Sequence, residues 1–527
     1  MDLSAVQSNF QYLRSRMPGE AVFYSVLKAD AYGHGLREIA LALTQAGCRR
    51  FAVESPQEGI RLRNEGISSE ILLMNPIPDW MAEICVQNDL SVSVIHRSIL
   101  TPLEEAARSM DKTCRIHLNV NVGLHRMGIA RSRLLQVARK AERMPHLILQ
   151  GIFGQPRTPD TAPQAYRMLK DSYHQLIQKN IRPLSLHFAN SAAFLTCPET
   201  AAEGARLGIL LYGVLPMEIY KKKSSPPPLK PAMSLDTELV QIRDLPRGSR
   251  FGYHSHKKTD RDMRIGVIPL GYYHGLDRKM AQGGYALLHG RKAFFQGSIS
   301  MNASTLDITG IPGGKIGDRV TVIGKQGNQT IDINQLAVQA GTIAAELMMR
   351  LGGNLVKTYR LSEGAPSYGM HIDKDRFDVD ILYLRSAKSL PDWLSLYDIV
   401  GFIQQQMGEF SEPRDAVDYA IGYALSAVRP GKGFIFLCVS GKRIIGASVC
   451  VQTETHGFIP KNILLYLCVH PEFRGKGLGK GLLRDTLTAG GGDCKVHIQP
   501  GNPAAGFFEK MGFEKKYLEY RFSKGDT

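Results

Sequence analysis

A lysine inside a short glycine-containing segment is the first residue that suggests chemistry. Lys28 lies in VLKADAYGHG, residues 26–35, where an apolar, β-branched run typical of a buried strand ends. A lysine amine at a strand end can act as a base, or form a Schiff base with a carbonyl group, if burial or neighbouring cations lower its pKa. Gly33 and Gly35 would let the backbone approach a ligand closely, and Tyr32 supplies a hydroxyl group. A single lysine at a strand end is more often a solvated charge, so the hypothesis depends on the whole segment.

A glycine-rich loop near the carboxyl end suggests a second, separate site. The run YLCVHPEFRGKGLGKGLLRD, residues 466–485, predicts a buried strand, a loop and then a helix. The loop RGKGLG, residues 474–479, would present successive backbone N–H groups at the start of that helix, which suits a pyrophosphate. Taken alone, such a loop is more often an ordinary glycine-rich turn.

The elements that would position Lys28 alternate between strands and helices. Amphipathic stretches such as LREIALALTQAG, residues 36–47, separate the strands and end at glycine. Eight strands with intervening helices over about 200 residues predict an α/β fold of the (β/α)8 barrel type, in which active sites lie at the carboxyl ends of the strands. A doubly wound open sheet is the structural alternative. The strand candidates begin near Ala21, Arg50, Glu70, Leu90, Cys114, Leu147, Leu184 and Ala205.

Two changes of pattern divide the rest of the chain. The polar, proline-rich stretch KKKSSPPPLKP, residues 221–231, cannot continue a helix and predicts a connector. Short strands punctuated by Gly, Asp and Pro follow, and they predict an antiparallel β-domain. A second boundary falls at residues 361–375. We therefore expect three domains: the barrel at 1–222, the β-domain at 231–360 and a mixed α/β domain at 376–527.

Composition excludes several classes of protein. The chain has 527 residues, 43% of them hydrophobic and 22% charged, which is typical of a globular multidomain protein rather than a disordered or fibrous one. No apolar run reaches the roughly 18 residues of a membrane helix, and no signal peptide is visible. The eight cysteines form no CxxC pair, so we expect reduced thiols in a cytoplasmic protein and no metal site. The net charge of +16 is spread over short runs, so we attribute it to solvated surface rather than to specific nucleic-acid binding.

The segment around Lys28 closely resembles the pyridoxal-phosphate lysine motif of alanine racemases. Further segments resemble that family in the same order, across residues 1 to about 360. They are NVNVGLHRMGIA at 119–130, HFANSAA at 187–193, ARLGILLYG at 205–213, PLGYYHG at 269–275 and GSISMN at 297–302. The resemblance implies a pyridoxal-phosphate barrel, followed by the β-domain of a racemase.

The resemblance also implies a role for each matched residue. Lys28 would carry the cofactor and act as one acid–base group, and Tyr272 of a second subunit would be the other. Two bases suit racemisation, because one face of the α-carbon loses a proton and the other gains one. Arg206 would face the pyridine nitrogen and, being charged, keep it unprotonated. The implied remaining contacts are Tyr32, Ser191, Gly208 and Ile209 with the phosphate, Arg126 with the phenolic oxygen and the substrate, and the Met301 amide with the substrate carboxylate. A shared site of this kind implies a homodimer that acts on small amino acids.

Several residues depart from the family pattern. Asn119 stands where many alanine racemases carry a lysine, often carboxylated, that offsets the charge of the neighbouring arginine. Arg126 would then lack its counter-charge and hold an anion instead. Serine racemases of the vancomycin-resistance type and broad-specificity racemases are similar at this position, so we expect alanine, serine or broader specificity. The other departures are Gln155 for a histidine, Asn302 and His274 for aspartates, and Gly353 near a phosphate-contacting tyrosine.

The last part of the chain, from about residue 390, resembles the acetyl-CoA-binding core of the GNAT family of N-acetyltransferases. The implied cofactor contacts are Val469, Arg474, Gly475, Gly477, Gly479 and Asn502. Phe508 stands where many such enzymes have a tyrosine that protonates the departing thiolate, and phenylalanine has no proton to donate. Water or Tyr517 would have to replace it. Glu454 is a candidate base, although a solvated glutamate at a strand end is the simpler interpretation.

Three functions follow from these resemblances. The first is a bifunctional enzyme, an amino-acid racemase joined to an N-acetyltransferase that acts on an amino acid or a related amine. The second is a racemase with a non-catalytic, CoA-binding regulatory module. The third is a decarboxylase of the same barrel architecture, which the racemase-type motifs and the missing decarboxylase-like cysteine loop disfavour.

Overall fold

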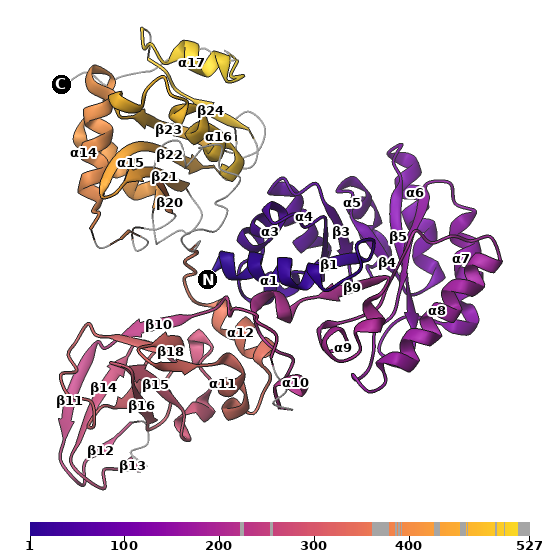
Figure 1. Cartoon of the computed structure of the whole chain (residues 1–527), viewed down its shortest axis with the longest axis horizontal. Coiled ribbons are helices and arrows are strands. Elements are labelled where there is room, and N and C mark those ends of the chain that lie inside the picture. Colours follow the sequence, from indigo (N-terminus) through magenta and orange to yellow (C-terminus); the bar gives the residue numbers. More distant parts are fainter. Residues whose placement is uncertain are drawn as a thin grey trace. The chain divides into compact units, whose positions relative to one another are not determined.

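In the computed structural model, the chain forms two compact units, Met1–Ala365 and Pro366–Thr527. The described residues are 1–221, 226–252, 257–360, 379–384, 387, 390–391, 393–425, 433–453, 460, 462–490, 493–499 and 501–514. Figure 1 shows the elements in chain order. None of the described helices has the length and apolar character needed to span a membrane.

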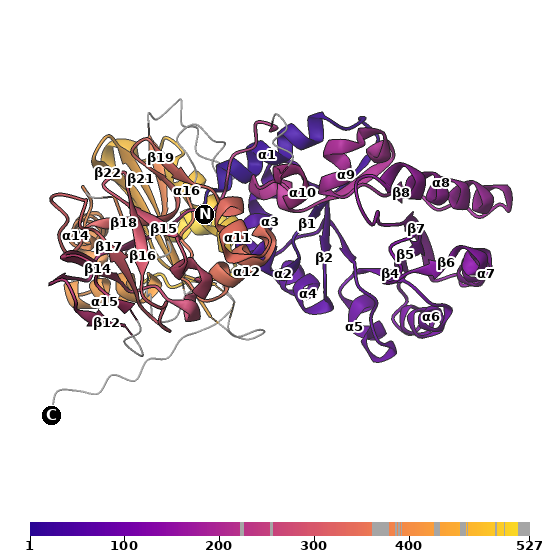
Figure 2. The ribbon, with the colours of Figure 1, turned by 90° about the horizontal axis from the view of Figure 1, so that it is seen from below.

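The first unit begins with a parallel barrel of eight strands (Figure 2). In barrel order they are β9 (Gly204–Leu207), β1 (Val22–Val26), β2 (Arg50–Val53), β3 (Glu70–Leu73), β4 (Ser91–Val94), β5 (Cys114–Asn121), β7 (Leu147–Phe153) and β8 (Ser185–His187). A parallel bridge between Ala189 and Ala205 joins β8 to β9, where the Arg206 N–H donates to the Ala189 carbonyl at 2.9 Å. The short β6 (Ile129–Ala130) pairs with β5 outside this path. The predicted barrel is confirmed, and the doubly wound open sheet is wrong.

Helices alternate with the strands because their apolar faces repeat at helical spacing. In α3 (Leu36–Gln45), for example, Leu36, Ile39 and Leu43 are fully buried. The other helices are α1 (Leu3–Ser15), α2 (Lys28–Tyr32), α4 (Pro56–Asn64), α5 (Ala82–Gln87), α6 (Leu100–Ser109), α7 (Arg131–Glu142), α8 (Ala162–Gln178), α9 (Ser191–Thr196) and α10 (Met217–Lys221). Short 3-10 turns add η1 (Asp79–Met81), η2 (Arg97–Ile99), η3 (Pro198–Ala201) and η4 (Ile209–Tyr212).

The backbone directly after Lys28 forms a left-handed turn. The four residues Ala29–Tyr32 have φ between +54° and +56°, the region that L-residues avoid. Each such residue costs about 1–2 kcal/mol relative to a right-handed conformation. The turn ends at Gly33, whose N–H donates to the Ala29 carbonyl at 3.0 Å. Surrounding contacts must therefore hold this conformation in place.

Those contacts come partly from the far end of the first unit. The Asp30 carboxylate accepts the Leu36 N–H at 2.9 Å and pairs with the Lys357 ammonium at 2.9 Å. Helix α12 (Ala344–Gly353) packs so closely on the turn that a Cβ at Gly33 would lie 2.5 Å from the Met348 carbonyl oxygen. The turn is thus fixed by both local and distant parts of the sequence.

An antiparallel β-domain completes the first unit. Its main sheet runs β10 (Leu235–Glu238), β18 (Arg319–Gln326), β15 (Tyr285–Leu288), β16 (Arg291–Gln296), β17 (Ser304–Asp307), β14 (Met263–Ile268) and β11 (Gln241–Leu245), with β19 (Gln329–Ile331) beside β18. A second pair joins β12 (Arg250–Phe251) to β13 (Lys257–Lys258). The predicted antiparallel domain is confirmed. It also contains α11 (Ile333–Ala340), α12, η6 (Tyr272–His274) and η7 (Arg278–Ala281), which the strand pattern did not predict.

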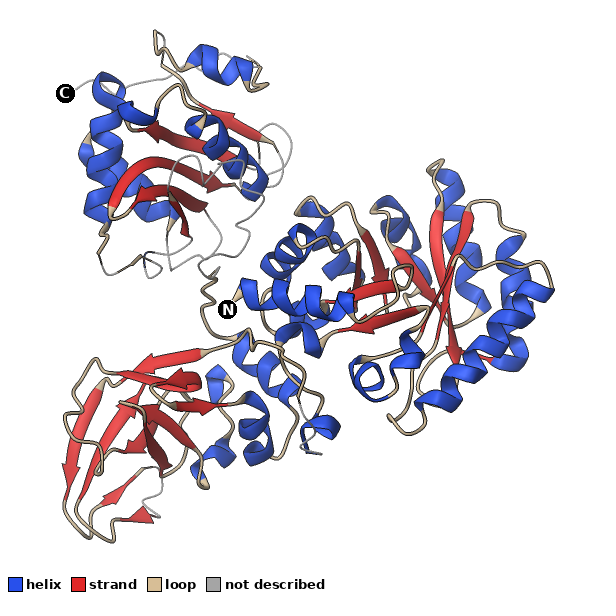
Figure 3. Ribbon diagram, in the orientation of Figure 1, coloured by secondary structure: helices blue, strands red, loops and turns tan. Residues whose placement is uncertain are grey.

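The second unit is a mixed sheet with helices on it (Figure 3). Its strands run β20 (Asp380–Leu384), β21 (Gly433–Ser440), β22 (Arg443–Gln452), β23 (Asn462–Val469) and β24 (Cys494–Val496), and only the β23–β24 pair is parallel. The helices are α14 (Leu396–Met407), α15 (Arg414–Ala424), α16 (Leu478–Gly490) and α17 (Ala505–Lys510), with turns η9 (Gly408–Phe410) and η10 (Pro471–Phe473). α14 and α15 pack in one apolar cluster and α16 in another. This architecture confirms the predicted mixed α/β domain.

Candidate active site

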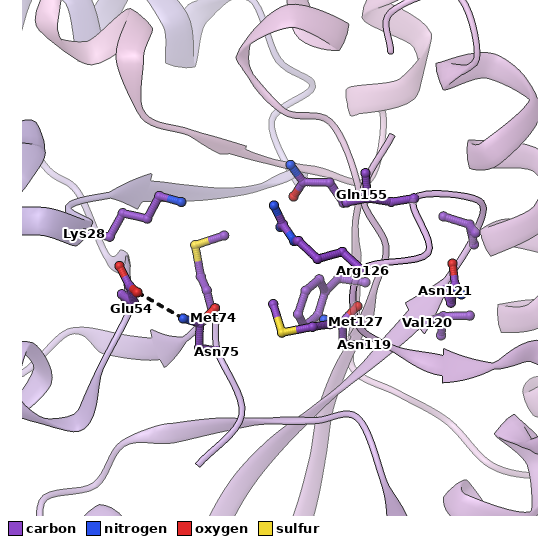
Figure 4. A pocket seen from close by; sticks show the side chains of 13 residues that line it. Lys28, Glu54, Met74, Asn75, Asn119, Val120, Asn121, Arg126, Met127 and Gln155 are labelled. Carbon is purple, nitrogen blue, oxygen red and sulfur yellow. Dashed lines mark hydrogen bonds between the residues drawn. The ribbon is translucent and has the colours of Figure 1, made fainter. Parts of the chain in front are cut away.

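A pocket opens at the carboxyl ends of the barrel strands, beside Lys28 (Figure 4). Lys28 follows β1 directly, and burial lowers the pKa of its amine, with Arg126 and Arg206 adding to the effect and Glu54 opposing it. The lowered pKa increases the fraction of unprotonated amine, the form that acts as a nucleophile or base. The lining residues are Lys28, Glu54, Met74, Asn75, Asn119, Val120, Asn121, Val122, Leu124, Arg126, Met127, Phe153 and Gln155.

Arg206 lies inside the barrel, on β9. The residue is only 3% exposed, and burial lowers the pKa of its guanidinium to about 10. The two terminal nitrogens donate to His187 Nδ1 at 2.9 Å and to the Gly154 carbonyl at 2.7 Å, with a longer contact to Gln155 Oε1 at 3.4 Å. Its Nε is buried and has no hydrogen-bond partner among the described residues. A buried donor without an acceptor costs free energy, so this atom indicates a place for a ligand acceptor.

Two hydroxyl groups converge near the start of η4. The Gly208 N–H donates to Ser191 Oγ at 3.4 Å, and a Cβ at Gly208 would lie 2.6 Å from Tyr32 Oη. Burial raises the pKa of Tyr32 to about 12, so its hydroxyl stays a proton donor at neutral pH. Ile209 follows Gly208 as the first residue of η4. The structure therefore brings together the four residues predicted to bind phosphate.

Arg126 and Asn119 line the same pocket as Lys28, and Figure 4 shows the Arg126 guanidinium on the side of the pocket opposite Lys28. Asn119 is on β5 and 9% exposed, and Arg126 lies in the loop between β5 and β6. Within the described part of the chain, no carboxylate forms an ion pair with Arg126. Gln155 also lines the pocket and accepts from Arg206. Two neutral amides, Asn119 and Gln155, thus line the pocket that holds Arg126.

Tyr272 and Met301 lie elsewhere, on neighbouring loops of the β-domain. The N–H of Tyr272 donates to the Ser300 carbonyl at 3.0 Å, which ties the two loops together. Both side chains are largely exposed, Tyr272 at 43% and Met301 at 54%. The pocket is lined by residues 28–155, so neither side chain belongs to its wall within one chain. Among the departures from the family pattern, His274 accepts the Gly271 N–H at 3.1 Å and so closes its own turn.

Glu54 and Asn75 belong to the pocket although the sequence analysis did not single them out. Glu54 follows β2 and is exposed, and its Oε1 accepts from Asn75 Nδ2 at 3.2 Å. Each follows a barrel strand directly or within two residues, and that position was the signal available in the sequence. Glu54 is the one carboxylate among the residues that line this pocket.

In the second unit, the glycine-rich loop leads into α16 as predicted. Gly475 and Gly477 have φ of +73° and +99°, which favour glycine. The Arg474 side chain donates to the Val469 carbonyl at 2.9 Å and so ties the loop to the end of β23. Gly479 lies in the first turn of α16, with its Cα beside Val469. The predicted residues of this loop are therefore adjacent.

The parallel pair β23–β24 opens beyond its third residue pair. β24 pairs with Asn462, Ile463 and Leu464 only, although β23 continues to Val469. The backbone groups of the remaining residues face no described strand on that side, which suits an extended molecule that carries amide groups. Asn502 Oδ1 accepts the Ala504 N–H at 2.9 Å, just before α17.

Phe508 is 6% exposed and packs with Leu464 and Leu483. The position where a tyrosine was expected is therefore part of the apolar core. The alternative proton donor Tyr517 and the candidate base Glu454 lie outside the described residues.

A closed parallel barrel with a desolvated lysine after its first strand, followed by an antiparallel β-domain, defines a class of barrel enzyme. Two family models match this part of the chain. The model of the alanine racemase N-terminal domain matches residues 1–216, and the model of the alanine racemase C-terminal domain matches residues 232–359. The acetyltransferase (GNAT) domain matches residues 431–515.

Individual relatives agree with the family models. The alanine racemase of Syntrophobacter fumaroxidans is 31% identical over 365 residues, 68% of this chain and 96% of the relative. That of Methanococcus maripaludis is 30% identical over 365 residues, 68% of this chain and 97% of the relative. Among solved structures, alanine racemase from E. faecalis has a TM-score of 0.63 at 27% identity, covering 68% of this chain and 97% of that one. The histidine racemase from Leuconostoc mesenteroides has a TM-score of 0.62 at 25% identity, covering 68% and 96%. The chain belongs to the alanine racemase family and is a racemase with an additional GNAT domain.

Proposed function

We propose that this protein is a pyridoxal-phosphate-dependent amino-acid racemase with a two-base mechanism, and that its GNAT domain binds acetyl-CoA. The observation that carries the first part is the buried Nε of Arg206, the one nitrogen of its guanidinium without an acceptor among the described residues. An unprotonated pyridine nitrogen is the kind of acceptor this atom lacks. The phosphate group would bind at Gly208, where the missing Cβ lets the Tyr32 hydroxyl approach the backbone and where Ser191 Oγ contacts the Gly208 N–H.

The residues of the pocket divide the work between binding and proton transfer. When bound, pyridoxal phosphate supplies an electron-withdrawing ring that stabilises the negative charge left on the substrate α-carbon. Lys28 would hold the cofactor covalently and move a proton on one face, helped by its lowered pKa. Arg206 would keep the ring nitrogen unprotonated, which weakens electron withdrawal and disfavours transamination. Arg126 would contact the phenolic oxygen and the substrate.

The second base and the carboxylate contact would come from a second subunit. Tyr272 and the Met301 amide lie on tied loops of the β-domain, largely exposed and absent from the pocket wall of their own chain. A homodimer that places these loops over the partner's pocket would supply the missing groups, and a twofold axis would complete both sites at once. The general test is exchange of the α-proton of L-amino acids in deuterated water. Absence of exchange with every common amino acid would contradict the racemase proposal.

We further propose that the substrate range extends beyond alanine. Asn119 cannot carry a carbamate, so racemisation should proceed at the same rate with and without added bicarbonate. Serine should be turned over within about tenfold of the alanine rate, since one extra hydroxyl in a pocket changes discrimination only modestly. Racemisation rates for both amino acids, measured in degassed and bicarbonate-containing buffer, check this prediction. A bicarbonate-dependent rate, or strict specificity for alanine, would contradict it.

For the GNAT domain, we propose transfer of an acetyl group to the amine of an amino acid, namely the D-form that the racemase produces. Racemisation of a free amino acid has an equilibrium constant of one, so it accumulates neither enantiomer. Acetylation of one enantiomer would draw the mixture to a single product. The glycine-rich loop before α16 and the open edge of β23 support acetyl-CoA binding. The connector expected at 361–375, which would keep the two activities close, lies outside the described residues.

The burial of Phe508 supports the alternative in which the GNAT domain is a non-catalytic, CoA-binding regulatory module. Phe508 fills the core where a proton-donating tyrosine was expected. The domain thus has support for binding acetyl-CoA, whereas this position supplies no acid for transfer and the other candidate, Tyr517, lies outside the described residues. In that alternative, acetyl-CoA would change the racemase rate without being consumed.

Supplying L-amino acid, pyridoxal phosphate and acetyl-CoA separates the two alternatives. We expect free CoA to appear faster with the amino acid than without it, and chiral chromatography to show a single N-acetyl enantiomer. Gly477→Ala should raise the KM for acetyl-CoA about tenfold or more, because an L-residue at φ +99° strains the loop. Gly401→Ala, in the middle of α14 with open space around it, is the matched control. CoA release that no amino acid stimulates would exclude this acceptor.

We also propose domain limits of 1–222, 231–360 and 376–527 and a cytoplasmic location. The racemase and GNAT matches support the first, and the eight free thiols support the second.

A further inference from the structure

Two buried histidines connect Arg206 to a carboxylate at the other end of the barrel. Arg206 contacts His187 Nδ1 at 2.9 Å, His187 Nε2 contacts His117 Nδ1 at 3.0 Å, and His117 Nε2 contacts Glu70 Oε1 at 3.1 Å. Both imidazoles are completely buried. The bridge has room because Gly151 has no side chain: a Cβ there would lie 2.5 Å from His117 Nδ1. We call Glu70, His117 and His187 the imidazole bridge.

The hydrogen bonds of the imidazole bridge have one possible direction when the histidines are neutral. A guanidinium can only donate, so His187 Nδ1 must accept and its proton must be on Nε2. That proton is donated to His117 Nδ1, which places the His117 proton on Nε2, facing Glu70. Burial lowers the pKa of His117 and holds that of His187 well below its usual range, so both rings are neutral at pH 7. Every donor therefore points from Arg206 toward Glu70.

The buried positive charge of Arg206 has no carboxylate in direct contact to balance it among the described residues. No described carboxylate forms an ion pair with Arg206, and the acceptors it contacts directly are all neutral. A buried charge with only neutral contacts is costly. Glu70 begins β3, so it lies at the end of the barrel opposite the pocket. There it also accepts from Tyr24 at 2.7 Å and pairs with Arg50 at 3.3 Å.

We propose that Glu70 is a positioning residue for Arg206: through His117 and His187 it supplies a counter-charge and fixes the tautomers that leave Nε of Arg206 facing the cofactor. This inference rests on the proposed role of Arg206 toward the pyridine nitrogen. It assigns the orientation of Arg206 to a carboxylate that never contacts the substrate and that two imidazole side chains separate from the arginine.

The direct test does not need the cofactor. Full-length protein labelled with ¹⁵N-histidine, free of cofactor at pH 7, should show two neutral, slowly exchanging imidazoles with the proton on Nε2. His117→Gln and His187→Gln assign the two signals. A proton on Nδ1 of either ring, or a doubly protonated ring, would overturn the proposal.

Kinetics of Glu70→Gln then test whether the bridge acts on the site. Glutamine keeps an acceptor for His117 but removes the charge, so we expect kcat to fall about tenfold while KM changes less than about twofold, and the absorption band of the bound cofactor to shift. Glu104→Gln is the matched control, because Glu104 accepts from His146 at 2.8 Å on the outside of the barrel. Equal kinetics and spectra for the two variants would overturn the proposal. If the tautomers are as stated but the wild type racemises no amino acid, the proposed function is wrong and the bridge stands.

Discussion

Lys28→Ala is expected to lower racemisation by about a thousandfold or more, because it removes both the covalent attachment of the cofactor and one of the two bases. The purified variant should also lose the visible absorption of the bound cofactor, and borohydride should no longer fix the cofactor to the protein. Rates measured by chiral chromatography and spectra of the same preparations check both results.

Lys179→Ala is the matched control for this substitution. Lys179 is an exposed lysine that follows α8, so the change removes the same side chain without touching the pocket. Its rate and spectrum should equal those of the wild type. Cofactor that borohydride still attaches to Lys28→Ala would mean that a different lysine carries it.

Mixing two inactive variants should restore activity if Tyr272 acts on the partner's pocket. Tyr272→Phe alone should lose about 10²–10⁴ in rate, the contribution of one acid–base group. In a mixed dimer of Lys28→Ala and Tyr272→Phe, one site has both defects and the other has neither. Random exchange of equal amounts makes half of the dimers mixed, so about a quarter of the wild-type activity should return.

Tyr273→Phe provides the control for the tyrosine, since its neighbour on the same turn is also exposed, at 57%. This variant should be active by itself, without being mixed with a second variant. Mixed dimers that stay inactive, although subunit exchange is demonstrated by mass, would place Tyr272 in the site of its own chain or outside any site.

The barrel strands were predicted closely because each is a short apolar run bounded by polar residues. The predicted start near Glu70 coincides with β3, and the start near Leu90 precedes β4 by one residue. Helices α11 and α12 were missed because the Gly, Asp and Pro residues that separate short strands throughout this region led us to expect strands there as well. The left-handed turn at Ala29–Tyr32 could not be predicted, since local preference opposes it and distant contacts impose it.

The site was only partly predictable for a similar reason. Lys28, Arg126 and Arg206 were identified through motifs. In the structure, Lys28 and Arg126 line one pocket, and both arginines contribute to lowering the pKa of Lys28. Glu54 and the Glu70–His117–His187 connection were not, because each residue is unremarkable in its own strand. Their significance arises only where β2, β3, β5 and β8 meet in space. The proposed pairing of Tyr272 with Lys28 would need a second subunit, which no pattern within one chain specifies.

The left-handed turn after Lys28 has a consequence for the order in which a newly made chain matures. Its supports include Met348 and Lys357, more than 300 positions later in the sequence. At roughly 5–20 residues per second, a ribosome needs some tens of seconds to make that stretch. The last barrel strand, β9, is complete at Leu207, so all eight barrel strands exist well before these contacts, and until then the lysine lacks the groups that hold its backbone. The nascent barrel therefore has no finished lysine site until the β-domain has been synthesised, and the proposed attachment of the cofactor to Lys28 would be a late event in the maturation of each chain.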